Sequence, residues 1–132
     1  MGQGIYTAFV FGAIDPPIET IDDAGYHETA EWFDRLASRL RHDEKNAVLT
    51  GYETDKKFAG VVIACSDPCL VDDWHCVEFS RRVIVNLDDW IAENCADKLV
   101  SARAAWEQIR EAGRDNGVEI PEGGLLIVSD WD

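Results

Sequence analysis

Positive charge is scarce in this sequence. Its 132 residues include 12 Lys and Arg against 26 Asp and Glu, which gives a formal net charge of −14. Such a chain is repelled by nucleic acid and by anionic membrane surfaces, and it is attracted to basic surfaces. The composition therefore argues against direct nucleic-acid or membrane binding and favours a basic protein as partner.

Targeting signals are also lacking. No apolar run approaches the roughly 18 residues that a membrane-spanning helix needs. The start, Met1 to Tyr6, has no basic region of the kind that opens a secretory signal. We therefore expect a cytoplasmic protein, in which the four cysteines are reduced thiols rather than a disulfide framework.

Signatures of catalysis and cofactor binding are absent. The sequence has no Gly-rich phosphate loop, dinucleotide fingerprint or EF-hand, and none of its three histidines lies in a nucleophile motif. Paired acids such as Asp72 and Asp73 suit Mg²⁺, but sites that act on phosphate usually add Lys or His, which the acid-rich segments have little of. We expect no enzyme activity and no cofactor, and the alternative is a metal-dependent enzyme.

A zinc site is a second alternative. Four soft ligands, Cys65, Cys69, His75 and Cys76, occur within twelve residues. Their spacing is irregular, because no Cys-x-x-Cys pair is present and Cys65 ends an apolar run where a buried thiol is ordinary. We expect no metal, with these four residues as the candidate ligands if zinc is bound.

The first half of the chain predicts alternating strands and one helix. Apolar β-formers over residues 4–14 predict a strand covered on both faces, followed by a loop to Gly25. Helical spacing of apolar residues, with acids early and arginines late, predicts a helix over 27–43. Residues 47–52 and 58–65 predict a β-hairpin whose second strand is central.

The second half predicts a long helix and a last strand. Residues 66–76 are ambiguous between loop and short helix, and part of 77–87 reads as strand. Asn86 or Asp88 can cap a helix that runs to Gly113 or Gly117 and is broken near 94–97. Residues 125–128 then predict a short strand.

These elements predict one α+β domain over residues 1–132. The expected architecture is a single mixed or antiparallel sheet of about 4–5 strands, with two main amphipathic helices packed against it.

The charge is unevenly distributed along the chain. Residues 1–34 contain no Lys or Arg and carry seven acids, which are Asp15, Glu19, Asp22, Asp23, Glu28, Glu31 and Asp34. Duplex DNA has one charge per about 1.7 Å, so the net charge matches about 24 Å of duplex, provided that most of it lies on one face. The alternative is a solvated acidic surface that has no specific target.

Tryptophan recurs beside these acids, at Trp74, Trp90 and Trp131. A tryptophan flanked by carboxylates can bind an Arg-rich surface, because the ring stacks on guanidinium groups while the acids pair with them. For Trp90 a buried anchor behind a helix cap is favoured, whereas Trp131 is the better interface candidate. The candidate partner-binding residues are Asp15, Glu19, Asp22, Asp23, Asp72, Asp73, Asp130, Trp131 and Asp132.

The two ends of the chain carry a resemblance. Residues 1–9, Met-Gly-x-Gly-x-Tyr-x-Ala-Phe, and residues 118–131, Val-Glu-Ile-Pro-Glu-Gly-Gly-Leu-Leu-Ile-Val-Ser-Asp-Trp, resemble small phage- or prophage-encoded accessory proteins. The resemblance transfers no functional residue. It implies that the chain blocks a host defence enzyme, of the CRISPR or restriction type, at a nucleic-acid site.

The expected function is accordingly that of an acidic inhibitor that occupies a basic surface of a nucleic-acid-handling host protein. The alternative is an acidic structural or accessory phage protein without a specific target. A homodimer is compatible with the sequence.

Overall fold

The structure, a computed structural model, describes residues 5–53, 56–65, 77–78 and 86–131. The elements, in chain order, are β1 (Ile5–Ile14), β2 (Glu19–Ile21), β3 (His27–Thr29), α1 (Glu31–Glu44), β4 (Val48–Glu53), β5 (Lys56–Cys65), β6 (Val77–Glu78), α2 (Leu87–Asn94), α3 (Ala96–Asp115) and β7 (Gly124–Trp131).

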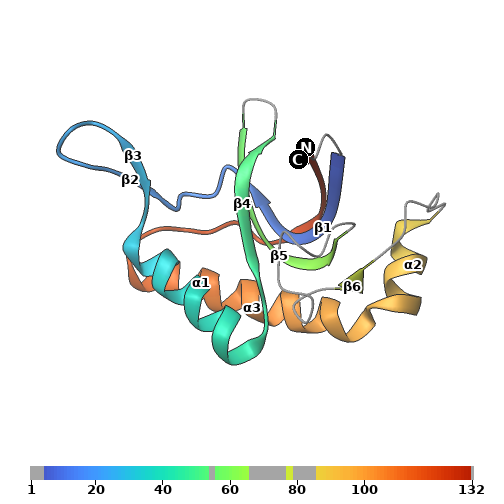
Figure 1. Cartoon of the computed structure of the whole chain (residues 1–132). Helices are drawn as coiled ribbons and strands as arrows, with labels where there is room; N and C mark the ends of the chain where they lie inside the picture. Colours follow the sequence, from blue (N-terminus) through green and yellow to red (C-terminus); the bar gives the residue numbers. More distant parts are fainter. Residues whose placement is uncertain (1–4, 54–55, 66–76, 79–85, 132) are drawn as a thin grey trace.

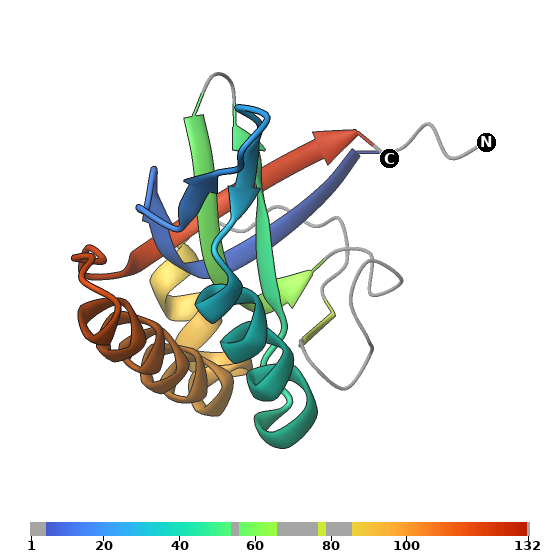
Figure 2. The same cartoon turned by 90° about the vertical axis from the view of Figure 1, so that its left-hand side faces the viewer.

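The main sheet has five strands, and the predicted α+β class is confirmed. Four strands lie in the order β4-β5-β1-β7 with antiparallel pairing, and β6 adds a short parallel pair to β5. The helices α1 and α3 lie side by side against one face of this sheet (Figure 1, Figure 2). A separate two-stranded hairpin, β2 and β3, projects from the same end as the start of α1.

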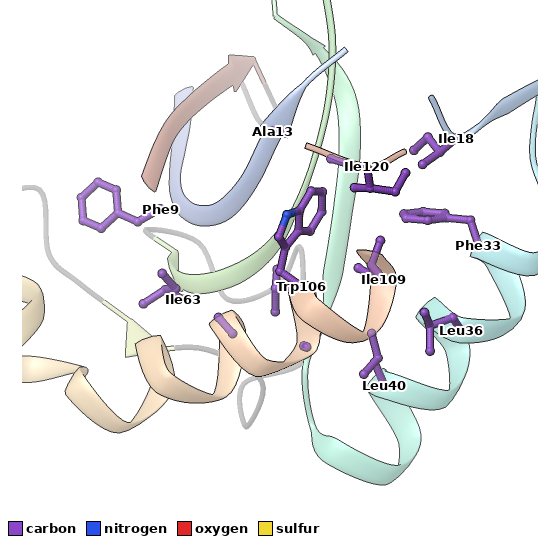
Figure 3. Close-up of a cluster of buried hydrophobic side chains, with 14 of the residues drawn as sticks. Phe9, Ala13, Ile18, Phe33, Leu36, Leu40, Ile63, Trp106, Ile109 and Ile120 are labelled. Carbon is purple, nitrogen blue, oxygen red and sulfur yellow. The ribbon is translucent and has the colours of Figure 1, made fainter. Parts of the chain in front are cut away.

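Both faces of the central strands are buried, as the apolar run over residues 4–14 predicts. Phe9 and Ala13 of β1 belong to the core between the sheet and the helices, where Trp106 of α3 lies among the aliphatic side chains (Figure 3). Ala8 and Val10 belong to a second cluster on the opposite face of the sheet. Burial on both faces explains why these strands lack the alternation of polar and apolar residues found in a half-exposed strand.

A row of glycines crosses three strands where the sheet curves. Gly124, Gly12 and Gly60 are direct neighbours in register on β7, β1 and β5. A Cβ atom on Gly12 would lie 2.4 Å from the Cα of Gly60, so the two backbones approach more closely than any side chain allows. The pairing of β1 with β5 also shifts register between Phe9 and Val10. Glycines and register shifts are the usual means by which sheets curve.

A buried amide joins the end of α1 to α3. Asn46 is 1% exposed, and its Oδ1 accepts hydrogen bonds from Lys98 Nζ and Ser101 Oγ, both at 3.1 Å. Lys98 Nζ also donates to the carbonyl of Lys45 at 2.7 Å, at the left-handed residue that ends α1. These bonds fix the antiparallel packing of the two helices.

The predicted break in the second helical segment is confirmed. Asn86 caps α2 by accepting a hydrogen bond from the Asp89 amide at 3.1 Å. The helix ends at Asn94, Cys95 has a non-helical backbone with φ −149° and ψ 36°, and α3 begins at Ala96. The break lets Ile91 and Trp106 face the same core from two helices.

Three boundaries differ from the sequence prediction. Residues 27–29 form β3 rather than the start of a helix, because they pair with residues 19–21, so α1 begins four residues later than predicted. The expected loop to Gly25 therefore contains β2. The last strand is longer than predicted, since β1 pairs with it over residues 124–131. The predictions for residues 66–76 and 79–85 lie outside the described residues.

Candidate functional site

The β2–β3 hairpin is held in shape by its own turn. Asp22 Oδ1 accepts hydrogen bonds from the amides of Ala24 at 2.9 Å and Tyr26 at 2.8 Å, and the Asp22 amide donates to the Tyr26 carbonyl at 2.9 Å. Gly25 supplies the positive φ of 89° that the turn requires. The carboxylate of Asp22 is thus a structural group of the turn.

Two other predicted partner-binding acids also make contacts within the chain. Asp15 directly follows β1 and has a positive φ of 52°, and its Oδ1 accepts a hydrogen bond from the Lys57 amide at 3.0 Å. Glu19 lies between Lys57 Nζ, at 2.5 Å, and His27 Nδ1, at 3.4 Å. Of the four N-terminal candidates, Asp23 is the one whose carboxylate is exposed with no intramolecular partner among the described residues.

The ion pair of Glu19 fixes the base of the hairpin to the sheet. The hydrogen bond from Lys57 is the main cause that lowers the pKa of the Glu19 carboxyl, with a smaller contribution from His27. Its charge is therefore already balanced locally. Glu19 thus anchors the hairpin to β5, and its role in binding a partner stays a prediction.

The shifted pKa predicts a pH-dependent contribution to stability. A carboxyl whose folded pKa lies below its unfolded value stabilises the fold fully above about pH 4.3, and the contribution is lost as the pH falls through the folded pKa. Glu19→Gln should lower the free energy of unfolding by roughly 0.5–1 kcal/mol at neutral pH. Urea denaturation of both proteins at several pH values should show this difference shrinking below about pH 4.

Glu28→Gln is the matched control, because Glu28 lies on the same hairpin with its side chain exposed. It should change the free energy of unfolding little, because no contact of Glu28 with another described side chain is lost. A constant difference between wild type and Glu19→Gln across the pH range would contradict the anchoring role.

Exposed carboxylates gather where three segments meet at one end of the molecule. The hairpin, the start of α1 and the end of α3 lie together there (Figure 1) because α1 and α3 pack antiparallel. We call the exposed acids of these segments the acidic end; they are Asp23, Glu28, Glu31, Asp34, Glu111, Asp115 and Glu119. Residues 22–29, 31–35 and 111–119 contain two arginines, Arg35, which pairs with Glu31, and Arg114.

A second acidic group lies at the opposite end. Asp88, Asp89, Glu93 and Asp97 are exposed on α2 and the first turn of α3, far from the hairpin in Figure 1. The described carboxylates are therefore not gathered on a single face. The condition for matching the whole net charge to DNA, that most of it lies on one face, is therefore not met by the described residues.

No protein-family model, curated protein or solved structure matches this chain. None of the described helices is long and apolar enough to cross a membrane.

The remaining predicted site residues are only partly described. Asp72, Asp73, Cys69, His75, Cys76 and Asp132 lie outside the described residues. For Asp130 and Trp131 the structure gives the backbone, which pairs with Tyr6 and Ile5 in the sheet. Trp90 packs edge-on against Phe9 at 5.7 Å between ring centroids, in agreement with the core interpretation.

Metal-binding groups are separated within the described part of the chain. Cys65 is buried on the second face of the sheet and Cys95 in the core beneath the helices. Burial raises the pKa of the Cys95 thiol, which disfavours the thiolate that metals bind. Among residues 5–53, 56–65, 77–78 and 86–131, no three His, Cys, Asp or Glu side chains are grouped to hold a metal ion.

Two of the surface hollows contain side chains that bear on small-molecule chemistry. One hollow, of about 260 Å³, lies between α3 and the start of β7. Of its two arginines, Arg110 forms an ion pair with Glu107. The guanidinium group of Arg103 lies over the Phe11 ring, 5.6 Å from the ring centroid. Its arginines are thus already engaged. The other, of about 500 Å³, includes Ser38 and His42 of α1, but no hydrogen bond joins these two side chains. Neither arrangement forms an activated nucleophile.

Sequence reasoning missed two exposed apolar residues of the hairpin. Ile21 is 65% exposed and Tyr26 is 71% exposed. The signal was present in Asp22 and Gly25, whose spacing is typical of a tight turn between two strands.

Proposed function

We propose that this domain is a binding protein that occupies a basic, nucleic-acid-binding surface of another protein and excludes nucleic acid from it. The acidic end is the observation that supports the proposal. Its exposed carboxylates outnumber the arginines of the same segments, and they come from parts of the chain that only the fold brings together.

The physical basis is electrostatic. Concentrated negative charge steers a protein toward a positive surface and raises the association rate, most strongly at low salt. Carboxylates can pair with the same Arg and Lys side chains that otherwise bind phosphate. A partner that handles nucleic acid has such a surface by necessity.

The resemblance at residues 1–9 and 118–131 narrows the class of partner. It favours a host defence factor, of the CRISPR or restriction type, whose nucleic-acid site the domain would block. The protein would then act as an inhibitor in the cytoplasm of the host cell.

A charge-matched pair of variants tests the proposal. The first neutralises the acidic end with Glu28→Gln, Asp34→Asn, Glu111→Gln and Asp115→Asn. The second makes the same change in net charge at the opposite end with Asp88→Asn, Asp89→Asn, Glu93→Gln and Asp97→Asn. Immobilised wild type and both variants are incubated with a host-cell lysate at increasing salt, with and without competing DNA, and the retained proteins are identified by mass spectrometry.

We expect wild type and the second variant to retain a basic nucleic-acid-handling protein that DNA displaces. The first variant should bind it roughly ten-fold more weakly at low salt, with a flatter salt dependence. Equal retention by all three proteins, or no effect of DNA, would show that the acids form only a solvated surface. If both variants lose binding equally, the binding depends on the net charge of the domain and not on a local site at the acidic end.

A further inference from the structure

The hairpin exposes apolar side chains on both of its faces. Ile21 pairs with His27 across the two strands, and Tyr26 immediately precedes His27. The hydrogen bond from the Asp22 amide to the Tyr26 carbonyl continues the pairing one residue beyond β3. Because successive side chains along paired strands point to opposite faces, Ile21 and Tyr26 lie on opposite faces of the ribbon. Figure 1 shows the ribbon extending beyond the sheet and helices, and both side chains are largely exposed to solvent.

The ribbon is attached to the rest of the domain at its base even though its faces are exposed. At its base Ile18 is fully buried, and the Ala30 amide donates to the Ile18 carbonyl at 2.7 Å. The ion pair between Glu19 and Lys57 adds a second attachment. At the tip, Asp22 accepts a hydrogen bond from the Tyr26 amide, which holds the turn. A preorganised element of this kind loses little conformational entropy when it binds.

The charges around the ribbon decide among its possible occupants. Asp22 and Asp23 lie at the tip, Glu28 lies on β3, and the rest of the acidic end lies at the base. A second copy of the chain, with its net charge of −14, and an anionic membrane are both repelled by this surface. A basic groove is complementary to it, because arginine both pairs with carboxylates and stacks on a tyrosine ring.

We propose that the β2–β3 hairpin inserts into a basic groove of the partner, with Tyr26 and Ile21 contacting opposite walls. The inference rests on the proposed function and adds the element that fixes the position of the domain in the partner. Asp22 is then a positioning residue, since it holds Tyr26 through the turn. The acids govern association, and the two apolar side chains govern dissociation.

Site-specific photocrosslinking tests the insertion. The photoreactive residue p-benzoylphenylalanine replaces Tyr26, Ile21, Asp34 or Val100, one position at a time, in the full chain. Val100 is the control because it is 67% exposed on α3 and lies outside the hairpin. Each protein is irradiated in a host-cell lysate with and without competing DNA, and crosslinked proteins are identified by mass spectrometry.

We expect positions 21 and 26 to crosslink to the same basic nucleic-acid-handling protein. The two positions should crosslink to different peptides of that protein, and competing DNA should abolish both crosslinks. Position 100 should not crosslink to it. Against this protein, once purified, Tyr26→Ala should dissociate at least about ten-fold faster with little change in association rate, whereas Val100→Ala should leave both rates unchanged.

Three outcomes would contradict the insertion, and only one of them would also contradict the proposed function. Crosslinking at position 34 without crosslinking at 21 and 26 would overturn the insertion while the acidic end stands as the contact surface. Absence of DNA-sensitive crosslinks at all positions would overturn both. If Tyr26→Ala dissociates as wild type does, the hairpin is not the anchor.

Discussion

Gly12→Ala should destabilise the fold severely, by about 3 kcal/mol or more. An alanine Cβ at this position would lie 1.9 Å from the carbonyl oxygen of Ala59 and 2.4 Å from the Cα of Gly60. Both are backbone atoms, so no side-chain rotation relieves the overlap. The central strands β1 and β5 would have to separate where they bury both faces. Urea denaturation followed by circular dichroism measures the loss.

Gly124→Ala is the control for this substitution. Gly124 is the neighbour of Gly12 in the same row, but a Cβ there meets no atom within 4 Å. Its stability should change by less than about 1 kcal/mol in either direction, since only backbone entropy and strand propensity differ. Comparable losses in the two variants would mean that close backbone approach is not the reason for glycine at position 12.

The sheet and the helix break were predictable because their signals are local. The continuous apolar runs of β1 and β5 indicate burial on both faces whatever the topology. Asn86 marks the start of α2 by the chemistry of its side chain, and polar residues around Asn94 mark its end. In each case residues close in sequence determine the element.

The hairpin was not predicted because its strands are three residues long. Residues 19–21 and 27–29 are too short to show a period, and Glu28 of the latter segment suits the start of a helix equally well. The contacts at its base, from Lys57 and from the buried Ile18, join residues distant in sequence. Such contacts decide between strand and helix, and they cannot be derived from propensity.

The negative charge of the candidate site was predictable from the sequence, but the residues that form the site were not. The acid-rich N-terminal segment indicated where negative charge begins, yet Asp15, Glu19 and Asp22 have contacts within the chain. The carboxylates of α3 join the acidic end only because α1 and α3 pack antiparallel. Charge counts along a sequence give the sign of a surface, whereas its location depends on the helix packing.

Trp106→Ala should be the most damaging large-to-small substitution in the core, with an expected loss of about 3–5 kcal/mol. Trp106 is 1% exposed and lies between α3 and the sheet (Figure 3). Its Nε1 donates to the Pro121 carbonyl at 3.0 Å, and its ring lies against Gly123, where a Cβ would be 2.7 Å from Trp106 Cδ1. The side chain therefore fills the core and also fixes the connection from α3 to β7.

Trp106→Phe separates these two contributions. Phenylalanine retains most of the buried ring but leaves the Pro121 carbonyl without its donor, so a loss of about 1–2 kcal/mol is expected. Urea denaturation gives both values, and amide exchange of residues 118–124 reports whether the connection opens. Because this connection leads from the acidic end into β7, Trp106→Ala should also increase exchange there before global unfolding. A loss below about 1 kcal/mol for Trp106→Ala would mean that the core closes around the cavity and that the tryptophan does not hold this connection in place.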